Sequence, residues 1–132
     1  MAASRSAGWD DVRRIALALP ETSERTTHGH AGWWVRNKLF VWERPLRPSD
    51  LHALGKSAPK GPILGVRVEH LLVKEALLKN EPRSCFTIPH FDGYPAVLIQ
   101  LRTVTKRALR NALVDGWSAC APPTLADELF GH

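Results

Sequence analysis

The chain has 132 residues, of which 44% are hydrophobic and 23% charged, with a net charge of +5. This composition is typical of one globular domain, so residues 1–132 are expected to fold as a single unit. Two cysteines cannot form a disulfide framework, and no apolar run reaches the roughly 20 residues of a membrane span. No secretion signal is visible either. We therefore expect a cytoplasmic protein without a membrane partner.

The first half of the chain predicts one helix and one hairpin. Apolar residues recur at helical spacing over 9–19, and Pro20 ends that pattern. A polar loop is expected from there to Gly32. The aromatic and β-branched runs 33–36 and 39–43 surround Asn37-Lys38, which predicts a β-hairpin.

The second half alternates between helical and strand patterns. Residues 45–62 hold four prolines and predict an irregular basic loop, with a short helical turn from Ser49 to near Gly55. The remaining predictions are strands at 63–68, 85–88 and 96–101, helices at 69–80 and 106–118, and a short terminal turn over 124–130. This order favours an α+β fold, in which an antiparallel sheet of about five strands carries helices mainly on one face.

Three segments resemble the MmcQ/YjbR family of small bacterial proteins. They are ALALPETSERTTHGHAGWWVRNKLFVW at 16–42, FTIPHFDGYPAVLIQL at 86–101 and DGWSACAPPTL at 115–125. The resemblance implies a secretion-chaperone-like α+β fold, also described as a double wing, with suggested DNA binding and no established enzymatic activity. The basic residue that often follows the Ala-Pro in that family is replaced here by Pro123-Thr124.

The basic residues are concentrated in one segment. Residues 36–67 contain seven lysines and arginines against two acids, and the rest of the chain is close to neutral. Such a segment either attracts phosphate or forms a solvated loop. A second unusual feature is the helix expected to start after Thr105, because Lys106, Arg107 and Arg110 stand where acids are favoured. A bound anion would compensate these charges.

The loop PHFDGYP is either a rigid connection or a binding loop that presents His90, Asp92 and Tyr94. His28 and His30 form an H-x-H, but nothing in the sequence brings a third ligand to them, so neither a metal nor a cofactor is expected. Cys85 has the chemistry of a nucleophile, yet its place in a strand predicts a buried and unreactive thiol. We therefore expect no enzyme.

Two functions remain open at this point. The first is non-catalytic nucleic-acid binding, with DNA as a candidate partner, which would be weak and salt-dependent because it would depend on contacts with backbone phosphates. Its contacts would come from a basic hairpin, loop and helix start: Arg36, Lys38, Arg44, Arg47, Lys106, Arg107 and Arg110. The second is a module for a protein partner or small anionic ligand, built from the aromatic hairpin and the PHFDGYP loop. Whether the basic residues form one continuous face separates the two.

Overall fold

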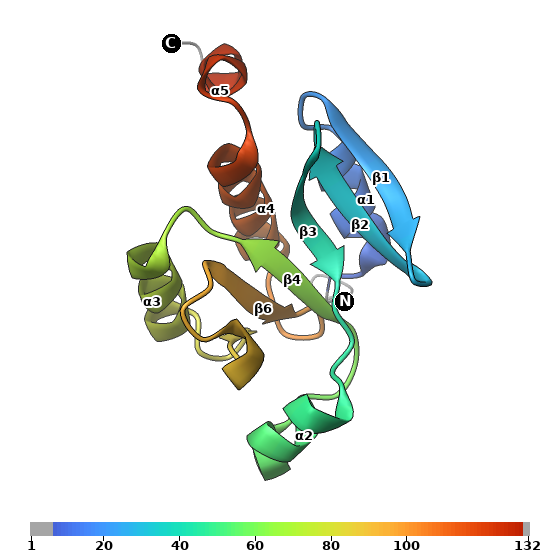
Figure 1. Cartoon of the computed structure of the whole chain (residues 1–132), viewed down its shortest axis with the longest axis vertical. Coiled ribbons are helices and arrows are strands. Elements are labelled where there is room, and N and C mark those ends of the chain that lie inside the picture. Colours follow the sequence, from blue (N-terminus) through green and yellow to red (C-terminus); the bar gives the residue numbers. More distant parts are fainter. Residues whose placement is uncertain (1–6, 131–132) are drawn as a thin grey trace, which may run out of the picture.

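The computed structural model describes residues 7–130, so the ends of the predicted 1–132 domain lie outside the described residues. An antiparallel sheet of order β1-β2-β3-β4-β6-β5 runs through the molecule (Figure 1). Its strands are β1 (Thr22–Thr27), β2 (His30–Val35), β3 (Lys38–Glu43), β4 (Ile63–Arg67), β5 (Cys85–Phe86) and β6 (Ala96–Gln100). The helices are α1 (Trp9–Leu17), α2 (Pro48–Leu54), α3 (Leu71–Asn80), α4 (Lys106–Cys120) and α5 (Pro123–Phe130), with 3₁₀ turns η2 (Gly55–Ser57) and η3 (Pro89–Phe91). The expected α+β class with an antiparallel sheet is confirmed.

Strand β1 corrects the expectation of a polar loop. It pairs with β2 along its whole length, from Thr22 opposite Val35 to Thr27 opposite His30. None of its side chains is fully buried, so its sequence lacks the apolar alternation that identifies a strand. Backbone hydrogen bonds and β-branched threonines hold this edge strand in place. The described sheet therefore has six strands rather than about five.

An irregularity in the hairpin decides which aromatic residues reach the core. Trp33 stands opposite Val41 and Trp34 opposite Leu39, so Phe40 has no cross-strand partner. Such a bulge lets two successive side chains point the same way, and Phe40 and Val41 are both buried in the main core. Trp33 faces that core, whereas Trp34 lies on the opposite face of the sheet.

The main core lies between the sheet and the helices α1 and α4. The predicted stripe of α4 is buried, and its Trp117 is fully excluded from water. The Trp117 Nε1 donates a hydrogen bond to the Pro20 carbonyl at 3.0 Å. On the other side, Trp9 of α1 stacks on Trp33 with ring centroids 6.4 Å apart. Both contacts hold the open end of the β1–β2 hairpin against the helices α1 and α4.

The opposite face of the sheet is only partly covered. A smaller cluster gathers around Ile88, Phe91 and Leu98, and Leu54 of α2 and Trp42 of β3 pack against it. We call this the outer face, because α1 and α4 lie on the other side. No helix within residues 7–130 has the length and apolar character to cross a membrane.

Replacing Trp117 by alanine should lower the free energy of unfolding by roughly 3–5 kcal/mol, because the indole is fully buried. Urea denaturation followed by circular dichroism measures the change. Leu72→Ala is the control, since Leu72 is 71% exposed and its loss should cost no more than about 0.5 kcal/mol. An unchanged midpoint for Trp117→Ala would contradict the assignment of this core.

Candidate functional site

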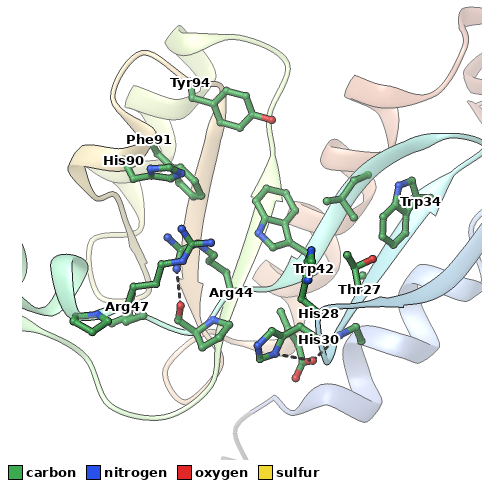
Figure 2. Close-up of a pocket in the computed structure, with 17 residues that line it drawn as sticks. Thr27, His28, His30, Trp34, Trp42, Arg44, Arg47, His90, Phe91 and Tyr94 are labelled. Atoms are coloured by element: carbon green, nitrogen blue, oxygen red, sulfur yellow. Dashed lines mark hydrogen bonds and ion pairs between the residues drawn. The ribbon is translucent and has the colours of Figure 1, made fainter.

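A groove of about 860 Å³ runs along the outer face over β2 and β3 (Figure 2). Its walls come from segments far apart in the chain, the β1–β2 turn, the stretch after β3 and the η3 loop. The labelled residues that line it are Thr27, His28, His30, Trp34, Trp42, Arg44, Arg47, His90, Phe91 and Tyr94. A second hollow of about 350 Å³ shares Leu39, Trp42 and Tyr94 with the groove and adds Lys38 and Arg67. The two hollows therefore meet at Trp42 and Tyr94.

Two glycines let the indole rings of the groove lie close to the sheet. A Cβ atom at Gly32 would come within 2.8 Å of the Trp34 ring, and one at Gly65 would overlap the Trp42 ring still more closely. Any other residue would push these rings away from the strands. Both indoles remain partly exposed, and the Arg25 guanidinium lies 5.0 Å from the centre of the Trp34 ring.

The wall formed by residues 89–95 is anchored from below by a buried lysine. Lys74 is 7% exposed, and its Nζ donates hydrogen bonds to the carbonyls of Phe91 at 2.6 Å and Tyr94 at 2.9 Å. Burial lowers the pKa of Lys74, and the charge of Asp92 opposes this shift. Sequence reasoning missed this residue, because it looks like an ordinary helix-surface cation.

Arg44 differs from the exposed cation that the sequence suggested. Its side chain is 7% exposed and forms an ion pair with Asp50, also buried, at 3.1 Å. Asp50 additionally accepts the backbone N–H of Arg47 at 2.8 Å and so caps the start of α2. The sequence interpretation placed Arg44 either among the phosphate contacts or in a solvated loop. The solvated position is corrected here, because Asp50 at the start of α2 pairs with this arginine and both side chains are buried.

The other predicted phosphate contacts do not form one face. Arg36 is held by Glu21 at 2.8 Å, and Lys106 lies 3.7 Å from Asp11 of α1. An anion does stand beside the start of α4, but it is a carboxylate of this chain. Lys38 lines the second hollow beside Cys120, the last residue of α4. Lys106 is the first residue of that helix, and at 1.5 Å per residue it lies about 20 Å from Cys120. Arg107 and Arg110 are exposed at the Lys106 end.

The predicted loop residues and histidines meet only in part. His90 and Tyr94 line the groove, whereas Asp92 is exposed and is absent from the described lining. His28 and His30 line the same groove as His90. Even so, no group of three or more histidine, cysteine or acidic side chains in the described chain lies close enough together to hold a metal.

Both thiols are shielded from solvent. Cys85 is 7% exposed, and burial raises its pKa to about 11. Cys120 is 4% exposed, and burial likewise raises its pKa. A protonated, buried thiol is a poor nucleophile at neutral pH, and Cys85 does not line either hollow in the described part of the chain.

No family model matches the chain. The uncharacterized proteins Mb2600 of Mycobacterium bovis and Rv2570 of Mycobacterium tuberculosis are each 48% identical to it over 129 residues, covering 96% of this chain and 98% of each relative. Among solved structures, the crystal structure of Deinococcus radiodurans protein DR2400, with the family-model domain DUF419, matches with a TM-score of 0.63. That match covers 98% of this chain and 92% of the other at 16% identity, which supports the fold alone.

Replacing Lys74 by methionine should loosen the wall of the groove. Two carbonyls would lose charged hydrogen bonds worth about 1.5–3 kcal/mol each, so the backbone amides of Asp92 and Tyr94 should exchange with solvent roughly tenfold faster or more. Hydrogen exchange followed by NMR measures this, and Lys79→Met on the same helix is the matched control because Lys79 is exposed. Wild-type protection in Lys74→Met would show that the loop does not depend on this lysine.

Proposed function

Since this chain belongs to the family of the mycobacterial proteins Mb2600 and Rv2570, whose names assign no activity, we propose its function from its groove. The chain is a non-catalytic binding module for an anionic ligand that carries a planar ring. The ring packs against the exposed parts of Trp34 and Trp42. The negative charge is attracted by the cations around the groove. Neither a metal nor a cofactor takes part in this proposal.

The observation that carries the proposal is the pairing of each groove indole with a glycine. Residues 32 and 65 carry no side chain, and each ring lies so close to the strand that a Cβ at these positions would clash with it. Tryptophan normally contributes most when buried, yet both rings stay partly exposed in a concave site. Pockets of several hundred Å³ lined by aromatic residues with a few convergent polar groups are the usual form of a ligand site.

The charge of the lining favours an anion. The two hollows are lined by Lys38, Arg44, Arg47 and Arg67, while Glu43 is the acid among the described residues that line them. Arg44 is matched by Asp50, so the remaining cations exceed the acid. Three histidines, His28, His30 and His90, also line the groove.

A second candidate is binding of duplex DNA along its phosphate backbone at the start of α4. It is favoured by the exposed cations Arg107 and Arg110 beside a helix end that Thr105 caps. DNA binding has also been suggested for the MmcQ/YjbR family, which this chain resembles in its PHFDGYP and tryptophan-helix motifs. The scatter of the other basic residues argues for the groove over this reading.

Trp34→Ala should weaken binding of adenosine monophosphate roughly 5- to 100-fold, because stacking of one base on an aromatic side chain contributes about 1–3 kcal/mol. Trp34 belongs to neither buried cluster, so the variant should keep its fold. Isothermal titration calorimetry with adenosine monophosphate and with indole-3-acetate measures the affinities. A Trp34→Ala protein that binds both probes as tightly as wild type would contradict the groove proposal.

The control variant is Lys106→Glu with Arg107→Glu, which reverses two charges outside the groove. The groove proposal predicts unchanged affinity for both small probes. Titration of a labelled DNA duplex at two salt concentrations addresses the second candidate, for which affinity should fall with salt by a log–log slope of roughly −0.9 per neutralised phosphate. Duplex binding that is lost in this variant and retained in Trp34→Ala would favour the phosphate reading.

A further inference from the structure

Arg44 keeps one hydrogen-bonding group without a partner at the groove. Its Nη1 contacts Asp50 at 3.1 Å and also donates to the Pro45 carbonyl. Its Nη2 is shielded from water and has no acceptor among the described residues. The side chain is more than nine-tenths buried and is among the residues that line the groove.

An arginine left in this state is costly. A guanidinium has five N–H donors in a fixed fork, and a buried donor without an acceptor destabilises the folded protein, more so when the group is charged. A lysine would satisfy Asp50 with one ammonium. The fork therefore supplies a donor that the fold itself does not use.

A second arginine lies beside Arg44 at this end of the groove. The ring of Phe91 lies over the Arg44 guanidinium, with Cζ 5.6 Å from the ring centroid, which favours the cation. In Figure 2 the side chains of Arg44 and Arg47 both extend into the groove below His90 and Phe91. Arg47 is exposed and, within residues 7–130, it forms no ion pair, so a second positive charge is available at this end.

We infer that the Nη2 group of Arg44 donates a hydrogen bond to the anionic group of the ligand, a carboxylate or phosphate oxygen, and that Arg47 supplies a second charge. This inference rests on the proposed function of the groove. Because Nη2 is shielded in the unliganded protein, a neighbouring side chain has to move for the oxygen to reach it. The ligand then lies with its anion at the Arg44 end and its ring against Trp42 and Trp34.

The experiment compares ligands that differ only in the anion. Adenosine monophosphate is paired with adenosine, and indole-3-acetate with indole. A charged hydrogen bond contributes about 1.5–3 kcal/mol, so wild type should bind the anionic member of at least one pair roughly 10- to 100-fold more tightly. Preference in the adenosine pair alone identifies a phosphate ligand, and preference in the indole pair alone identifies a carboxylate.

Arg44→Lys keeps a cation beside Asp50 but removes the second donor of the fork. It should reduce the preference for the anion at least tenfold and leave only the part that the charges of Arg47 and the new lysine supply. Arg83→Lys is the matched control, because Arg83 is exposed and lies outside both linings, and it should keep the full preference. A preference in Arg44→Lys as large as that of wild type would overturn the inference.

A measurement on wild type keeps the test independent of how Arg44→Lys folds. The side-chain Nε–H resonance of Arg44 should shift on addition of the preferred anion and not of its neutral partner. If both members of a pair bind equally and this resonance does not move, the inference fails while the groove proposal stands. If no probe of either pair binds, the proposed function fails, and the inference fails with it.

Discussion

The outer face of the sheet is shaped by the absence of side chains at Gly32 and Gly65. A Cβ at either position would lie inside normal contact distance of an indole ring, so these two residues decide how near Trp34 and Trp42 approach the strands. The bulge between β2 and β3 sends Trp33 and Phe40 to the core and leaves Trp34 outside. As a result, the rings of Trp34 and Trp42 line the bottom of the groove.

The walls of the groove depend on two buried cations. Lys74 binds two carbonyls of the 89–95 loop, and Arg44 binds Asp50 where the chain turns into α2. A buried charge is tolerated only when it is paired or hydrogen-bonded. Lys74 and Arg44 therefore each hold one wall of the groove in place, and both matter more to its shape than the exposed basic residues around it.

The sequence predicts those helices and strands whose apolar residues recur at regular spacing. The stripes of α1 and α4, the hairpin of β2 and β3, and the positions of the later strands along the chain were all foreseeable, because apolar spacing carries that information. Strand β1 was not, since an exposed edge strand of TSERTT has no apolar face to reveal it. The two halves of the groove could be predicted only separately. No local sequence pattern shows that the segment with His28 and Trp34 packs beside the loop with His90 and Tyr94. The role of Arg44 depends on its ion pair with Asp50 at the start of α2, so counting charges along the chain could not show that this arginine is paired and buried.

The central claim is that ligands are bound by the aromatic groove and not by the basic start of α4. Chemical-shift mapping of isotope-labelled wild-type protein with adenosine monophosphate and indole-3-acetate tests it most directly. The account predicts that the indole Nε1 resonances of Trp34 and Trp42 and the amides of 90–94 shift together, with the amides of 106–110 unchanged. Shifts confined to 106–110, or none at saturating probe, would contradict it.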